Sequence, residues 1–193
     1  MFSVFDIKTS KAYPAIALQI AAYLELARNG TTLDLLFDEG RHLFTQESTG
    51  QILPSVTQVL SKMGLAPDYF WVDPWYALRG THVHKATELH ENGALDESTV
   101  DDEIAPYLAA YQKFRKEWAG EIIKTEYRMW HPTYRYAGIV DRVIEGNKCY
   151  ILFLKKNGKY SFEEVKNIRS NLNVFLSALN VMKWKQENLK EGQ

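Results

Sequence analysis

The sequence predicts an α/β or α+β fold, in which a central mixed β-sheet is flanked by helices. Strand-like alternating runs and helix-like periodic runs occur in the same chain, and helical patterns stand near both of its ends. The chain has 193 residues, of which 46% are hydrophobic. That length and composition suit a single domain with a sizeable core, which we expect to cover residues 1–193.

The first thirty residues predict one strand followed by one helix. Residues 2–9 have the apolar alternation of a short strand. Apolar side chains then recur on one helical face over residues 15–29. Pro14 suits the first turn of this helix, and Gly30 is a typical residue just past a helix end.

The middle of the chain predicts a small β-meander and three helices. Residues 33–53 alternate apolar and polar side chains between turn residues, which indicates a hairpin or meander. Ser55 is expected to cap a short helix that Gly64 ends. The other two helices are expected from Asp73-Pro74 to Asn92-Gly93, with a weak point at Gly80, and over residues 105–118.

The last third of the chain predicts the main strands and a long closing helix. The expected strands cover residues 122–130, 136–144 and 149–154, with a further short strand near 160–165. The helix is expected from about residue 172 to residue 189, because apolar side chains recur there at helical spacing.

Composition limits the compartment and the class of partner. No apolar run approaches the roughly 18 residues that a membrane span needs, and the opening residues do not resemble a signal peptide, so we expect a cytoplasmic protein without a membrane partner. The single cysteine, Cys149, excludes a cysteine-built zinc or iron–sulfur site. The net charge of −1 argues against a protein that coats nucleic acid and is compatible with an enzyme.

The triplet Asp6-Ile7-Lys8 is the first candidate for chemistry. Side chains alternate across a strand, so Asp6 and Lys8 share one face while Ile7 anchors the other. The Ile7 carbonyl could also face a metal ion. Taken alone, this pattern is common on strands that have no catalytic role.

A carboxylate within an apolar strand is the second candidate. Asp141 lies within the run 138–143, and a buried carboxylate is costly unless it is paired or coordinates a cation. The structural alternative is an ion pair with Arg142 or Arg135 at a strand end.

His84 and Glu88 form the third candidate. They are four residues apart on an expected helix and therefore share one face. The alternative is a solvated pair on an exposed surface. Combined with Asp6 and Asp141, these oxygen and imidazole ligands suit Mg²⁺ or Mn²⁺. Such a cation can activate water and neutralise a phosphate, with Lys8 beside it to orient the water or stabilise charge.

Together these motifs resemble the RecB-like branch of the PD-(D/E)xK nuclease superfamily, including its small phage-type exonucleases. The likeness covers most of the chain. The family's helix motif matches Gly80, Thr81, His84 and Glu88, and its Gly-x-x-Asp-Arg strand matches Gly138, Asp141 and Arg142. Its Asp-x-Lys-Thr strand matches Asp6, Lys8 and Thr9, and its Gln-x-x-x-Tyr helix matches Gln19 and Tyr23. The segment that leads into the family's fold matches Leu53 to Thr57. The resemblance implies a restriction-endonuclease-like core in a bacterial or phage-infected cell.

The resemblance also implies a role for each matched residue. Asp141, Asp6 and the Ile7 carbonyl would be metal ligands, completed by His84 and Glu88. Lys8 would be the catalytic lysine beside Asp6, Asp141 and Glu88. Gln19 and Tyr23 would steady the site or contact the substrate backbone.

The order of the motifs departs from the family. There, the Asp-x-Lys strand and its following helix come after the Gly-x-x-Asp-Arg strand, whereas here residues 1–30 come first. The displaced segment would fit between Val143 and Cys149, and its removal from there leaves good turn chemistry. We therefore predict a transposed chain that rebuilds the same pocket, or exchanges this segment with another copy to form a homo-oligomer.

Three functions follow as hypotheses. The first is metal-dependent hydrolysis of DNA, as single strands or duplex ends, by an exonuclease. The second is a nucleic-acid-binding module of the same fold with impaired turnover, and the third is a structural domain in which the motif residues form ion pairs. Candidate contacts to the backbone or bases of a nucleic acid are Lys11, Tyr13, Arg79, Lys85, Arg128 and Arg135.

Overall fold

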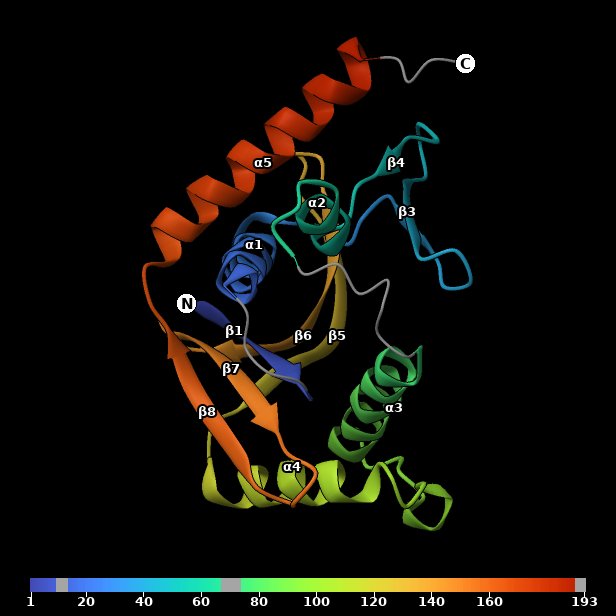
Figure 1. The fold of residues 1–193 in the computed structure, drawn as a ribbon, viewed down its shortest axis with the longest axis vertical. Coiled ribbons are helices and arrows are strands. Elements are labelled where there is room, and N and C mark those ends of the chain that lie inside the picture. Colours follow the sequence, from blue (N-terminus) through green and yellow to red (C-terminus); the bar gives the residue numbers. More distant parts are fainter. Residues whose placement is uncertain (10–13, 67–73, 190–193) are drawn as a thin grey trace. The chain divides into compact units, whose positions relative to one another are not determined.

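The structure is a computed structural model that describes residues 1–9, 14–66 and 74–189 (Figure 1). It confirms the α+β class and the mixed central sheet. Lys11, Tyr13 and Asp73, named from the sequence, lie outside the described residues. The elements are β1 (Phe2–Lys8), α1 (Ala15–Asn29), β2 (Leu35–Asp38), β3 (Leu43–Gln46), β4 (Ile52–Leu53), α2 (Val56–Lys62), α3 (Pro74–Glu91), the short 3₁₀ helix η1 (Glu97–Thr99), α4 (Ala105–Glu117), β5 (Ile122–Trp130), β6 (Ala137–Glu145), β7 (Cys149–Leu154), β8 (Tyr160–Val165) and α5 (Ile168–Asn188).

Two predicted details are wrong. Helix α5 begins at Ile168, about four residues earlier than expected. Ile168 lies four residues before Leu172 and extends the apolar periodicity by one turn, and Asn167 leads into the helix from a left-handed backbone conformation (φ +57°). Gly80 does not interrupt α3, which is continuous from Pro74 to Glu91. No helix of the described residues is both long and apolar enough to cross a bilayer.

The chain packs as two compact units, each built from three separate segments. The first, called here the β1 unit, comprises Met1–Ala12, Tyr69–Tyr127 and Asp141–Glu164. The second, called here the α5 unit, comprises Tyr13–Asp68, Arg128–Val140 and Val165–Gln193. Strands β5 and β6 each contribute residues to both units, so the five-stranded sheet contains residues of both units.

Strand β1 lies at the centre of the five-stranded sheet. The five-stranded sheet has the order β5-β6-β1-β7-β8, so β1 lies between two strands that follow each other in the chain (Figure 1). It pairs antiparallel with β6 and parallel with β7. The backbone N–H of Gly146, in the turn from β6 to β7, donates to the carbonyl of Met1 at 2.9 Å. Strand β1 thus pairs within its own chain, whereas the transposition of residues 1–30 and their exchange between copies stay predictions.

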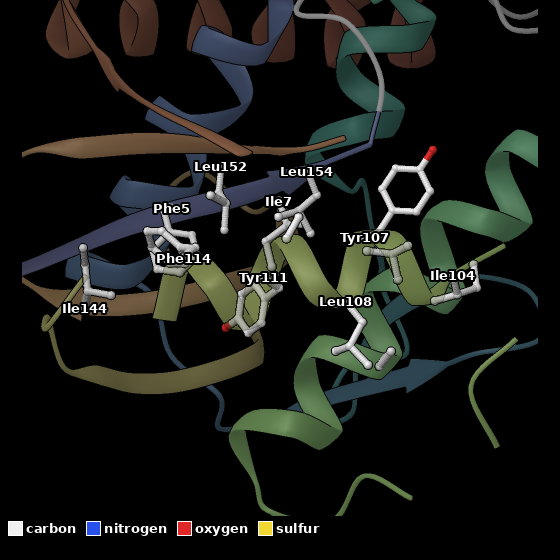
Figure 2. Close-up of a cluster of buried hydrophobic side chains, with 13 residues drawn as sticks. Phe5, Ile7, Ile104, Tyr107, Leu108, Tyr111, Phe114, Ile144, Leu152 and Leu154 are labelled. Atoms are coloured by element: carbon white, nitrogen blue, oxygen red, sulfur yellow. The ribbon is translucent and has the colours of Figure 1, made fainter. Parts of the chain in front are cut away.

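Aromatic packing fixes β1 in its unit. Phe5 is fully buried and meets Phe114, Trp118 and Phe162 edge-on, with ring centroids 5.6–5.7 Å apart. Ile7 joins the same buried cluster, which includes residues of α3 and α4 (Figure 2). Edge-to-face rings add to the stabilisation from buried area. Phe5 and Ile7 therefore anchor the strand that carries Asp6 and Lys8.

The α5 unit holds the small sheet and the remaining helices. Strands β2, β3 and β4 form an antiparallel sheet as predicted, and Phe44 and Leu53 pack from it against Trp130. Ser55 caps α2 in a full capping box with Gln58, which confirms the predicted helix start.

Candidate metal centre

The site begins where β1 and β6 separate within the β1 unit. Pairing between these strands ends at Phe5 and Arg142, while pairing between β1 and β7 continues to Lys8. The backbone of Ile7 is therefore left without a strand partner on the β6 side. Its N–H donates to Asp141 Oδ2 at 2.7 Å, and its carbonyl lies 3.1 Å from His84 Nε2. Side chains of Asp141 and His84 thus replace the missing strand hydrogen bonds.

His84 faces two carboxylates with its other nitrogen. Nδ1 lies 3.4 Å from Asp141 Oδ2 and 3.5 Å from Glu126 Oε1. Because Nε2 must donate its proton to the Ile7 carbonyl, a neutral ring would turn the Nδ1 lone pair toward two anions. The ring is therefore stable there only as the cation or with a metal ion at Nδ1.

The protonation of His84 follows from this geometry. Burial lowers the pKa of His84, but the charges of Asp141 and Glu126 outweigh it and raise the pKa to about 9. In the metal-free protein the imidazolium is thus the cation between the two carboxylates. One ligand atom each from His84, Glu126 and Asp141 lies within 4.8 Å of the others, a spacing that suits a shared metal ion.

Asp6 is the most deeply buried acid of the site. It is 1% exposed, and the Lys8 ammonium lies 2.6 Å from its Oδ2. Apart from this ion pair, neither carboxylate oxygen has a hydrogen-bond partner among the described residues. Burial raises the pKa of Asp6 to about 7, and the neighbouring Asp141 carboxylate adds to the rise, while Lys8 opposes it. Such unsatisfied buried oxygens are costly unless a cation binds them.

Glu126 belongs to the site and was missed from the sequence. It lies on β5 between Lys124 and Arg128, in a polar alternation that is typical of a solvated strand face. The backbone of Glu126 is left-handed (φ +45°), a conformation that L-residues rarely adopt within a strand. The sequence offers no signal for that kink, and such strain is often found at functional sites.

Arg142 holds Glu126 in place and is itself completely buried. Its Nη1 donates to Glu126 Oε1 at 3.2 Å and to the Asp141 backbone carbonyl at 2.6 Å. Its Nη2 donates to the Thr87 hydroxyl at 2.8 Å, and its Nε donates to the Tyr111 hydroxyl at 3.2 Å. Arg142 thereby ties β5 and β6 to α3 and α4 behind the site.

These contacts argue against the alternative raised for Asp141, an ion pair of its carboxylate with Arg142 or Arg135. Arg142 bonds the backbone carbonyl of Asp141 and the carboxylate of Glu126, so the Asp141 carboxylate is turned to Ile7 and His84 instead. Arg135 donates to the side-chain carbonyls of Gln46 and Gln51 within the α5 unit.

Glu88 is not a member of the three-residue group. Its carboxylate pairs with Lys85 Nζ at 2.9 Å, within the same helix α3. His84 and Glu88 share a helix, as predicted, but His84 pairs with Asp141 and Glu88 pairs with Lys85. The structure therefore brings together Asp6, Lys8, Ile7, His84 and Asp141, adds Glu126, and gives Glu88 a different partner.

Gln19 and Tyr23 are buried in the α5 unit. Gln19 Nε2 donates to the Tyr23 hydroxyl at 3.1 Å, which is the contact that their four-residue spacing on α1 allows. The Tyr23 ring packs against Gly138 so closely that an added Cβ there would lie 2.9 Å from the ring. This explains the glycine. The predicted substrate role of Gln19 and Tyr23 stays a prediction.

The donor set fits a divalent cation. The carboxylates of Glu126 and Asp141 and the imidazole of His84 form the group, and Asp6 adds a buried carboxylate next to Asp141. Oxygen with a single nitrogen ligand suits Mg²⁺ or Mn²⁺. The chain matches no protein-family model and no curated protein sequence.

Proposed function

We propose that this protein is a metal-dependent nuclease that hydrolyses phosphodiester bonds in DNA, as an exonuclease, with Mg²⁺ or Mn²⁺. The observation that carries the proposal is the position of His84 Nδ1 between two carboxylates, in contact with the strand that bears Asp6 and Lys8. The choice of DNA and of exonuclease action follows from the family resemblance of the motifs.

Each residue has a distinct task in this proposal. Asp141, Glu126 and the neutral form of His84 would hold the cation, with Asp6 beside them. The Ile7 carbonyl, which the resemblance implies as a ligand, accepts from His84 Nε2 on the side of the ring away from Nδ1. A bound divalent cation supplies an activated water and neutralises charge on the phosphate.

Lys8 supplies a second positive charge, next to the cation. Its ammonium is fixed next to Asp6 by the alternation of β1. From that position it orients the attacking water and stabilises the negative charge that develops on the phosphate oxygens. Arg142 positions Glu126 and does not contact the substrate.

The test is cleavage of end-labelled single- and double-stranded DNA with Mg²⁺ or Mn²⁺, against EDTA. We expect metal-dependent cleavage that falls by roughly 100-fold or more in Lys8→Ala, the size of effect seen when one transition-state donor is removed. Lys113→Ala is the matched control, because Lys113 is an exposed lysine of the same unit that pairs with Glu117.

Two outcomes would redirect the proposal. DNA binding without cleavage by a folded protein would favour the alternative, a binding module with impaired turnover. Loss of stability in Lys8→Ala, with neither cleavage nor binding by the native chain, would favour a structural role.

A further inference from the structure

Arg79 extends the candidate site along β1. It lies on α3, and its Nη2 donates to the Thr9 carbonyl at 3.4 Å, just as His84 contacts the Ile7 carbonyl at 3.1 Å. The two carbonyls are two residues apart, at most about 7 Å along the chain. The Arg79 guanidinium therefore contacts the chain two residues beyond the point that the His84 imidazole contacts. The separation of these two contact points is comparable to that of neighbouring phosphates in a nucleic acid.

Arg79 lacks the carboxylate that other arginines of its unit have. Arg115 pairs with Glu91 at 2.8 Å and Arg142 with Glu126 at 3.2 Å. No carboxylate of the described residues lies within 4.0 Å of Arg79, and its Nε is buried without a hydrogen-bond partner. A part-buried guanidinium without a counter-charge is stabilised when an anion binds to its remaining donors.

Two aromatic rings hold the guanidinium in place. Arg79 Cζ lies 4.9 Å from the centroid of the Tyr76 ring and 5.2 Å from that of Tyr107. Tyr107 is buried, whereas Tyr76 is 52% exposed. Stacked rings leave the planar fork of an arginine preorganised for a phosphate. The exposed part of Tyr76 beside it offers a ring on which a base can stack.

We propose that Arg79 binds the phosphate next to the one that is cleaved, that Tyr76 stacks on the adjoining base, and that the substrate is therefore a single strand. Stacking on a protein ring requires a base that is not already covered by its neighbours, which duplex DNA does not offer along its length. This inference rests on the proposed nuclease function for the position of the cleaved phosphate.

The experiment measures binding without catalysis. Fluorescence anisotropy in EDTA compares a labelled 12-nucleotide single strand with a hairpin duplex of the same base composition, over a series of salt concentrations. The variants are Arg79→Met, Arg79→Lys and Tyr76→Leu. Lys113→Met, which removes an exposed cation from the same unit, is the control.

The expected results separate charge from stacking. Arg79→Met should weaken single-strand binding roughly tenfold and make the slope of log K against log salt less steep by about 0.7, the effect of one lost phosphate contact. Arg79→Lys keeps the charge and should retain the slope. Tyr76→Leu should weaken binding about fivefold or more with the slope unchanged. The native chain should bind the single strand more tightly than the hairpin.

A second measurement distinguishes failure of this inference from failure of the nuclease. With Mn²⁺, Arg79→Met should cleave bis(p-nitrophenyl) phosphate, which has no neighbouring phosphate, as fast as the native chain, yet cleave oligonucleotides more slowly. An unchanged salt slope in a folded Arg79→Met, tighter binding of the hairpin, or no binding by the native chain would overturn the inference. Each of these can be observed whether or not the protein cleaves DNA.

Discussion

Two histidines of this protein lie beside glutamates, one in each compact unit, and their surroundings differ in one respect. His131, in the α5 unit, has both ring nitrogens satisfied: Nδ1 accepts from the N–H groups of Thr133 and Tyr134 at 3.2 Å, and Nε2 lies 3.3 Å from Glu25. His84, in the β1 unit, donates from Nε2 and then faces two carboxylates with Nδ1.

The difference shows which histidine is available to a ligand. Both ring nitrogens of His131 already have partners within the protein, so His131 stabilises a turn and leaves no nitrogen for a metal. His84 can be neutral only if something positive takes the place of its Nδ1 proton. A histidine beside an acid does not by itself indicate a metal site. The candidate metal centre is identified by a ring with one nitrogen hydrogen-bonded and the other facing two carboxylates.

The largest expected effect distinguishes two glutamates that the sequence and the structure rank differently. Glu126→Gln should weaken Mn²⁺ binding by about 10- to 100-fold, because the substitution removes a charged ligand next to His84. Glu88→Gln should change the affinity by less than about threefold, since the Glu88 carboxylate is paired with Lys85. Isothermal titration calorimetry with Mn²⁺ at a fixed pH measures both.

The same pair of variants can contradict this ranking. A loss in Glu88→Gln that equals or exceeds the loss in Glu126→Gln would restore the ligand set implied by the resemblance and remove Glu126 from the site. Thermal unfolding of the metal-free variants is the control, because Glu126 also accepts from the buried Arg142.

The next effect concerns protons released on metal binding. The pKa of His84 is about 9, above its ordinary value of 6.5, so its contribution to metal-free stability is complete below pH 6.5 and is lost as the pH rises through 9. The pKa of Asp6 is about 7, above its ordinary value of 3.8, so its contribution is complete below pH 3.8 and is lost as the pH rises through 7. Both groups make the metal-free protein less stable toward high pH.

Metal affinity should change in the opposite direction. Asp6 is about half ionised at pH 7 and largely ionised at pH 8, and His84 must lose one proton at either pH, so Mn²⁺ should bind at least about tenfold more tightly at pH 8 than at pH 7. Calorimetry in two buffers of different ionisation enthalpy should show release of about one proton. In His84→Gln only the smaller dependence that comes from Asp6 should remain, and an equally steep dependence in that variant would assign the proton to another group.

Local patterns predicted most of the fold, while the complete site depended on long-range contacts. Capping residues and periodicity act within a few positions, so the ends of β1, α1 and α2 followed from the sequence. The motif match predicted only that residues 1–30 correspond to the chain position between Val143 and Cys149, and the structure places β1 between β6 and β7 in the sheet. Glu126 could not be predicted, because its left-handed backbone and its bond to Arg142 arise only when β5 meets β6. Glu88 was predicted from its four-residue spacing to His84 and from the motif match, and neither of these distinguishes a metal ligand from a residue that pairs with Lys85.

The smallest expected effect lies on the His131 side of the comparison. His131→Gln removes the acceptor for two backbone N–H groups and the contact with Glu25, so it should lower the free energy of unfolding by about 1 kcal/mol. It should leave Mn²⁺ affinity unchanged, because both ring nitrogens of His131 already have partners within the protein. His84→Gln should abolish most of the Mn²⁺ affinity and should also lower the stability of the metal-free protein, because it removes the cation between Asp141 and Glu126. Denaturant unfolding and calorimetry on the two variants measure stability and Mn²⁺ affinity for each.

The result for His131→Gln can also contradict the comparison. If this variant weakens Mn²⁺ binding, then hydrogen bonds at both ring nitrogens do not identify a structural histidine, and the assignment of His84 as a ligand loses its main support.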